Sequence, residues 1–152
     1  MKKLLTIILG LIVLNVTVQA QILKPVKWRF TSKKVKPNIY EIHLTASIDK
    51  GWKIYSQNTP KGGPLPTKIS FAKNPLVLLG GKVKEVGEMH KVDEPAFGVQ
   101  VFYFTDKVDF VQIVKLKKPG VKTSLSGTVE FMACDESQCL PPEEIGFEVE
   151  LK

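Results

Sequence analysis

The fold class follows from one stretch, residues 40–48, which reads YEIHLTASI. Apolar and polar side chains alternate through it, from Tyr40 to Ile48. Successive side chains of a β-strand point to opposite faces, so such alternation is typical of a half-buried strand. The stretch therefore predicts a strand with one face toward a core and the other toward solvent.

The same two-residue period recurs on both sides of this stretch. It is present in residues 26–30 (VKWRF) and, near the end of the chain, in residues 145–151 (IGFEVEL). Lys50-Gly51 predicts a turn, and three prolines predict a loop over residues 58–67, because proline cannot donate to a sheet. We also expect residues 76–79 and 82–88 to form separate strands. Residues 99–104 and 108–116 should form a hairpin with its turn at residues 105–107.

Eight or nine short strands with no helical period predict an all-β protein. Regular spacing in about 130 residues favours an immunoglobulin-like antiparallel β-sandwich. An up-and-down barrel is the alternative fold. No internal repeat or domain boundary is visible, so a single domain is expected.

Composition excludes several functional classes. The chain has 152 residues, 43% hydrophobic and 24% charged, which excludes collagen-like and disordered proteins. Its net charge is +7, but Arg29 is the only arginine among 22 basic residues. Recognition of phosphates and bases favours arginine, so nucleic acid is not an expected partner.

The first twenty residues predict a secretory signal peptide. Lys2 and Lys3 precede an apolar run over residues 4–14, and Ala20 ends a cleavage-like pattern. The run is shorter than the roughly 20 residues of a membrane span. We therefore expect residues 21–152 to be the mature domain, not membrane-spanning, in an exported compartment that permits disulfides.

The two cysteines, Cys134 and Cys139, lie between the last two expected strands. A hairpin brings its flanking residues together, so the pair should reach disulfide distance. A ring of six residues stabilises a fold by about 2 kcal/mol in the chain-entropy model, near the low end for disulfides. From spacing alone, a structural staple and a redox-active pair are equally well supported.

Metal and cysteine–histidine chemistry are less well supported. Zinc would need ligands beyond the two cysteines, and His43 and His90 are the only histidines. His43 falls on the polar face of its expected strand, and His90 in an expected charged turn. We expect neither a metal nor another cofactor.

Charge around the cysteines predicts weak nucleophiles. Residues 134–144 contain four acids and no basic residue. Negative charge disfavours a thiolate and raises a thiol pKa above its usual value of about 8.5. The pKa of Cys139 is therefore expected to lie above that value unless a distant lysine folds close.

Three stretches of the chain resemble one family. Cys139-Leu140-Pro141-Pro142-Glu143, Gly51-Trp52-Lys53-Ile54-Tyr55 and Asp93-Glu94-Pro95-Ala96-Phe97-Gly98 occur in the order seen in the amino-terminal periplasmic domain of DsbD-type thiol–disulfide interchange proteins. The resemblance covers the mature chain. The chain departs from the better-known members in having four residues between the cysteines, where they have five. Pro95 and Ala96 also intervene before the aromatic residue of the loop.

The resemblance implies an immunoglobulin-like domain that relays electrons by thiol–disulfide exchange. It makes Cys139 the sulfur that meets partners and Cys134 the resolving thiol. Phe97, in a loop with Asp93 and Glu94, would cap the disulfide. Tyr55 and Tyr103 would be aromatic walls, although both also fit an ordinary core.

Partners follow from the same resemblance. Family members usually continue into a membrane electron transporter and a thioredoxin-like domain, whereas this chain ends at Lys152. We therefore expect thioredoxin-like proteins and a membrane transporter as separate partners. The alternative is a non-catalytic β-sandwich binding module with a permanent Cys134–Cys139 disulfide.

Overall fold

The computed structural model describes residues 23–95 and 98–152. Nine strands account for its regular structure: β1 (Val26–Lys36), β2 (Ile39–Ile48), β3 (Lys53–Tyr55), β4 (Lys68–Phe71), β5 (Val77–Glu94), β6 (Val99–Leu116), β7 (Thr123–Phe131), β8 (Ala133–Cys134) and β9 (Glu143–Leu151). Within the described residues there is no helix, and so none that is long and apolar enough to cross a membrane. The expected signal peptide lies outside the described residues.

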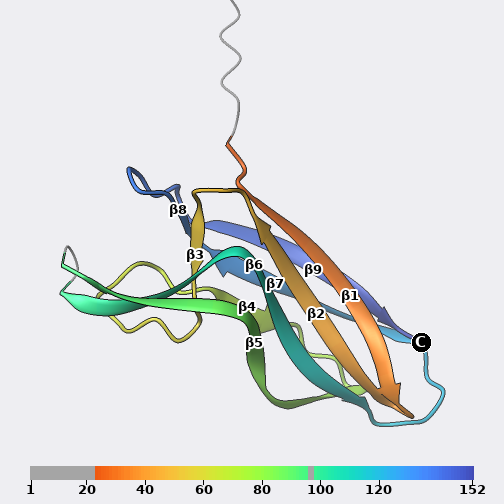
Figure 1. Cartoon of the computed structure of the whole chain (residues 1–152). Helices are drawn as coiled ribbons and strands as arrows, with labels where there is room; N and C mark the ends of the chain where they lie inside the picture. Colours follow the sequence, from red (N-terminus) through yellow and green to blue (C-terminus); the bar gives the residue numbers. More distant parts are fainter. Residues whose placement is uncertain (1–22, 96–97) are drawn as a thin grey trace, which may run out of the picture.

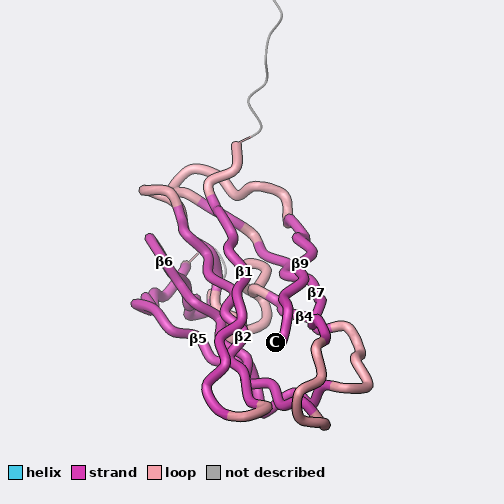
Figure 2. The backbone as a smooth tube through the Cα atoms, turned by 90° about the vertical axis from the view of Figure 1, so that its right-hand side faces the viewer, coloured by secondary structure: helices cyan, strands magenta, loops and turns pink. Residues whose placement is uncertain are grey.

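The strands form two antiparallel sheets that pack face to face. The larger sheet has the order β1-β2-β6-β3-β8, with β5 paired to β6, and the smaller has the order β4-β7-β9. Figure 1 shows β1 and β2 crossing in front of β7 and β9, and Figure 2 shows the two layers separated when the molecule is turned. The predicted all-β, immunoglobulin-like sandwich is confirmed.

The core lies between the two sheets and follows the predicted alternation. In β2, the five apolar side chains from Tyr40 to Ile48 are at most 6% exposed. Trp28 of β1 reaches across, with its ring 5.8 Å from that of Phe110 and 5.3 Å from that of Phe131. The aromatic contacts join the larger sheet to the smaller one.

The predicted hairpin at residues 105–107 is wrong. These residues continue β6, which runs without interruption from Val99 to Leu116. Gly87 of β5 pairs with Val108 of β6, and Met89 pairs with Phe104. Between these two pairs, residues 105–107 of β6 lie opposite the single residue Glu88 of β5. The turn-like residues therefore form a β-bulge, which bends a strand without ending it. Pairing with β5 on both sides of the bulge overrides the local turn signal.

The same long pairing changes two other expectations. The strands expected at residues 76–79 and 82–88 are parts of β5, which has a second irregularity between Gly80 and Lys84. His90 lies within β5 and not in a turn.

The bulge also divides the neighbours of β6. Beyond it toward the carboxyl end, β6 pairs with β2, with Val108 opposite Ala46. Before it, β6 pairs with the short strand β3, with Phe104 opposite Ile54. β3 in turn pairs with β8, which carries Cys134. The first half of β6 thus positions the region of the cysteines.

Candidate functional site

Cys134 and Cys139 are joined by a disulfide. Its S–S distance is 2.03 Å, and the two Cα atoms are 4.0 Å apart. β7 and β9 pair from Phe131 opposite Glu143 onward, so both cysteines lie in the connection between two paired strands, as predicted. Cys134 belongs to β8, and Cys139 faces it in an isolated bridge.

Asp135 organises the loop between the two cysteines. Its Oδ1 accepts hydrogen bonds from the backbone N–H and hydroxyl of Ser137 and from the N–H of Gln138, at 2.7 to 2.8 Å. These donors hold the pKa of the Asp135 carboxyl below its usual value. The N–H of Leu140 also donates to the carbonyl of Ala133, which closes the base of the loop. The loop therefore has a defined geometry although its tip is exposed.

The two sulfur-bearing residues differ in exposure. Cys134 is 1% exposed, whereas Cys139 is an exposed residue. A thiolate from another protein can therefore approach Cys139 far more readily than Cys134.

Strand alternation places Cys134 on the outer face of the larger sheet, away from the main core. Ile54, Phe104 and Ala133 belong to the core between the sheets. Their neighbours in the strands form a second cluster on the opposite face. This outer cluster consists of buried Tyr55, Val101 and Cys134, with Val99, Tyr103 and Met132 packed against them.

The structure brings Tyr55 and Tyr103 together with Cys134 in the outer cluster. Tyr55 lies opposite Tyr103 in the sheet and is 4% exposed. Burial is the main cause that raises the pKa of Tyr55 to about 12, and the negative charges of Glu94 and Glu136 add to it. Tyr103 in turn stacks on His90, with ring centroids 5.2 Å apart.

Asp93 and Glu94, which the resemblance assigned to the cap, point to opposite faces of the sheet. Glu94 is the register partner of Val99, which packs against the outer cluster, so Glu94 lies on the same face as Cys134. Asp93 is its neighbour in β5 and points to the other face, where its Oδ1 accepts a hydrogen bond of 3.2 Å from Gln100. Phe97 lies outside the described residues. The flanking turn is closed by the N–H of Gly98, which donates to the carbonyl of Glu94.

The proline-rich loop forms another wall of the outer cluster. A Cβ added to Gly63 would lie 3.3 Å from a methyl group of Val101, so the loop backbone approaches the cluster closely. Glu85 of β5 anchors the start of this loop. Its carboxylate accepts hydrogen bonds from the Ser56 hydroxyl at 2.7 Å and from the Gln57 N–H at 2.7 Å. The sequence predicted the loop but not its anchor, because Glu85 is 28 residues away.

Sequence reasoning also missed Lys53. Its Nζ lies 5.2 Å from the centroid of the Tyr103 ring and 3.4 Å from Oε1 of Glu136. The alternation in Lys53-Ile54-Tyr55 was the available signal, because it places Lys53 and Tyr55 on one face.

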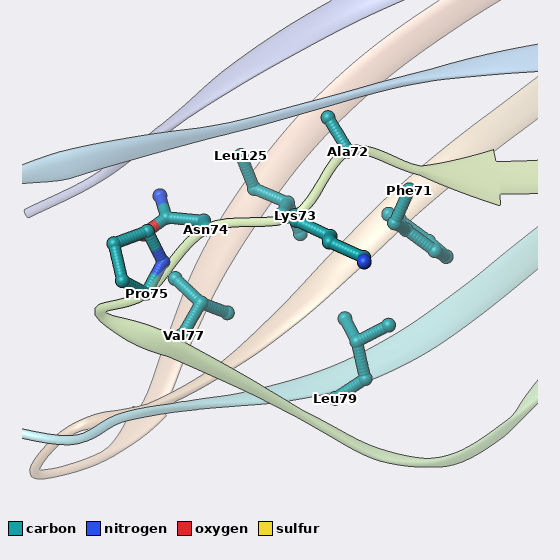
Figure 3. A pocket seen from close by; sticks show the side chains of 8 residues that line it. All are labelled: Phe71, Ala72, Lys73, Asn74, Pro75, Val77, Leu79 and Leu125. Atoms are coloured by element: carbon teal, nitrogen blue, oxygen red, sulfur yellow. The ribbon is translucent and has the colours of Figure 1, made fainter.

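Other polar groups and pockets lie apart from the outer cluster. Nδ1 of His43 is 2.7 Å from Oδ2 of Asp109, between β2 and β6. Within the described residues, no group of three or more potential ligands could hold a metal. A pocket of about 430 Å³ opens between the two sheets where β4 leads into β5 (Figure 3). It is lined by Phe71, Ala72, Lys73, Asn74, Pro75, Val77, Leu79 and Leu125, none of which belongs to the outer cluster.

Two solved structures share this fold. The crystal structure of the Neisseria meningitidis DsbD n-terminal domain in the reduced form matches with a TM-score of 0.55 and 14% identity, over 84% of this chain and 88% of that one. The N-terminal periplasmic domain of ScsB from Proteus mirabilis matches with a TM-score of 0.50 and 15% identity, over 83% of this chain and 44% of that one. Comparison with curated protein sequences gives no match.

The family follows from the sequence. The family model described as "Thiol:disulfide interchange protein DsbD, N-terminal" matches residues 19–151. The match includes every described strand and both cysteines. The chain therefore belongs to the family of DsbD N-terminal domains, and it is a thiol–disulfide relay domain with a Cys134–Cys139 disulfide.

Proposed function

We propose that this domain relays electrons in the periplasm by successive thiol–disulfide exchanges at Cys139. The observation that carries the proposal is the difference in exposure within one disulfide, since Cys134 is 1% exposed and Cys139 is exposed. The ScsB relative is described as a periplasmic domain, which supports the compartment. Cleavage after Ala20 would release residues 21–152 there.

The exchange begins with attack by a partner thiolate on Sγ of Cys139. The S–S bond breaks, a mixed disulfide forms, and the electron pair leaves on Sγ of Cys134. The second thiol of the partner then loses its proton and attacks the mixed disulfide, which releases Cys139. The partner dithiol gives up two electrons and two protons in total, and Cys134 and Cys139 become thiols. The reverse sequence reduces a target protein.

The proposed partners are thioredoxin-like proteins and a membrane electron transporter. In either partner a dithiol would supply the two electrons, and the exposed residue Cys139 is where its thiolate would attack. In this proposal Phe97 caps the disulfide until a partner docks, and Tyr55, Tyr103 and Glu94 form the walls around it. Asp93 is not part of these walls, because it points away from Tyr55. We assign it instead to the β5–β6 hairpin, where its carboxylate accepts a hydrogen bond from Gln100.

Mixed-disulfide trapping tests the assignment of the two sulfurs. We expect Cys134→Ser, which leaves Cys139 free, to form a stable mixed disulfide with a thioredoxin-like protein. Cys139→Ser should form little, because its remaining thiol is buried. Equal trapping by the two variants would contradict the assignment.

A redox titration separates the relay from a permanent staple. The purified domain is equilibrated with thiol buffers of defined potential, and its free thiols are counted. A relay disulfide should be reduced within the range of exchange proteins, about −120 to −270 mV. Full oxidation below about −300 mV is typical of structural disulfides and would favour the binding module.

A further inference from the structure

Lys53 lies directly opposite Cys134 between two paired strands. β3 and β8 run side by side in Figure 1, and Lys53 is the register partner of Cys134. Paired residues of antiparallel strands have Cα atoms about 5 Å apart and side chains on the same face. The side chain of Lys53 is only 18% exposed, and its Nζ lies over the ring of Tyr103.

The exchange reaction requires negative charge to develop at this position. When the S–S bond opens, the electron pair leaves on Sγ of Cys134, a residue that is 1% exposed. Burial disfavours a thiolate unless an opposite charge lies close to it. A low pKa of the leaving thiol also speeds thiol–disulfide exchange.

Three carboxylates and one ammonium group surround Cys134, so most of the charges there oppose a thiolate. The groups contributed by the neighbouring strands and by the cysteine loop are Lys53 and Tyr55 of β3, His90 and Glu94 of β5, Tyr103 of β6, and Asp135 and Glu136 of the loop. The three carboxylates repel negative charge. Lys53 carries the positive charge that compensates it.

The present contacts of Lys53 leave it free to change partner. Its Nζ is 3.4 Å from Oε1 of Glu136, whose side chain is 92% exposed. An ion pair with a carboxylate in water adds little stability. The second contact, with the Tyr103 ring, keeps the ammonium group on the outer face near Cys134.

We propose that Lys53 is a positioning residue of the exchange reaction, whose ammonium group stabilises the thiolate on Cys134 as the disulfide opens. The inference rests on the proposed function, because it assumes that the disulfide is opened. No atom is transferred from Lys53, since it acts by charge alone. When the second partner thiol loses its proton in the resolving step, the Cys134 thiolate takes up the proton.

The thiol pKa of Cys134 provides the direct test. We would prepare Cys139→Ala, which leaves Cys134 as the single thiol, and follow thiolate absorbance at 240 nm against pH. Adding Lys53→Met should raise the pKa of Cys134 by about one unit or more, the usual effect of an opposite charge. Lys53→Arg should restore most of the shift. Lys53→Gln serves as a second neutral variant if Lys53→Met does not fold.

Lys91→Met is the matched control. Lys91 also places its Nζ over an aromatic ring, 5.0 Å from the centroid of Phe102. Lys91 and Phe102 are paired with each other and are the strand neighbours of His90 and Tyr103, so they point to the opposite face of the sheet. It removes the same charge and a similar contact from the same hairpin. The pKa of Cys134 should therefore not change. A shift equal to that of Lys53→Met would overturn the proposal, because it would show an effect of net charge alone.

The reduction rate gives the second measurement. With Cys139 present, Lys53→Met should slow reduction by dithiothreitol roughly threefold or more, which corresponds to one pKa unit at a typical exchange sensitivity. An unchanged pKa in both neutral variants would overturn the role of Lys53, even if the wild type exchanges with a thioredoxin-like protein. A raised pKa without such exchange by the wild type would support the role of Lys53 and contradict the proposed function instead.

Discussion

The two halves of β6 contribute to two hydrophobic clusters of very different size. From Val108 to Leu116, its inward side chains lie between the two sheets and are at most 2% exposed. From Val99 to Phe104, alternate side chains leave the core and cover Cys134 on the outer face. One strand therefore supports both the scaffold and the site, and the bulge at residues 105–107 separates them.

The difference in size between the two clusters has a consequence for dynamics. Among the described residues, the core cluster holds 20 buried residues and the outer cluster three. Regions with few buried contacts open at lower free energy than the global unfolding reaction. The outer cluster should therefore open for an exchange partner while the sandwich stays folded.

The largest expected effect is a loss of stability when a large side chain is removed from the core half of β6. Phe110 is fully buried, and its ring lies 5.8 Å from that of Trp28 and 6.4 Å from that of Phe104. Phe110→Ala should lower the free energy of unfolding by about 3–5 kcal/mol, as measured by urea denaturation. Val101→Ala is a smaller truncation in the outer half and should cost about 1.6 kcal/mol for two lost methyl groups. Equal losses would contradict the division into scaffold and site.

Opening the disulfide should have a smaller effect. Reduction removes a six-residue ring and should lower the free energy of unfolding by about 2 kcal/mol in the chain-entropy model. β7 and β9 are paired independently of the ring, so the fold should persist. Urea denaturation of oxidised and reduced protein, each checked by circular dichroism, measures the difference. Loss of the folded signal on reduction would mean that the disulfide is structural.

How much of this comparison is predictable from sequence depends on the range of the contacts. The core half of the fold was predicted, because the alternation in residues 40–48 is a local pattern that burial reinforces. The hairpin at residues 105–107 was predicted wrongly, because its turn signal is local while the pairing of β5 with both halves of β6 is not.

The site was predicted in part for the same reason. The cysteine pair and the two tyrosines came from motifs. Lys53 did not, because its proposed role depends on the pairing of β3 with β8, which places it opposite Cys134, 81 residues later in the chain. The expectation of a high thiol pKa for Cys139 considered only acids close in sequence. It stays a prediction, and Lys53 supplies a nearby positive charge on the side of Cys134.

Removal of the proposed cap should change a rate and not stability. Phe97→Ala should speed reduction by dithiothreitol several-fold, because an aromatic side chain beside Glu94 would shield the disulfide. The free energy of unfolding should stay within about 0.5 kcal/mol of the wild type, as for surface changes. Leu78→Ala is the control, since Leu78 is a 49% exposed apolar residue near the other end of β5. Unchanged reduction with Phe97→Ala would assign Phe97 to the surface.

The smallest effect concerns the stability of the outer cluster, and it becomes visible only when the pH is raised above about 10. The pKa of Tyr55 is raised to about 12, first by burial and then by the charges of Glu94 and Glu136. The folded state therefore binds the phenolic proton more tightly than the unfolded state does, whose pKa is about 10. The resulting stabilisation is complete below pH 10 and is lost as pH rises from about 10 to about 12.

Absorbance at 295 nm measures this titration directly, because tyrosinate absorbs there and neutral tyrosine does not. We expect a step near pH 12 in the wild type that Tyr55→Phe removes. Tyr40→Phe is the control, because it removes a hydroxyl from a different cluster and leaves Tyr55 itself unchanged. If Tyr55→Phe instead removes a step near pH 10, the Tyr55 hydroxyl is in contact with water. The outer face would then be already open before any partner docks, and the contrast between a closed outer cluster and an exposed Cys139 would fail.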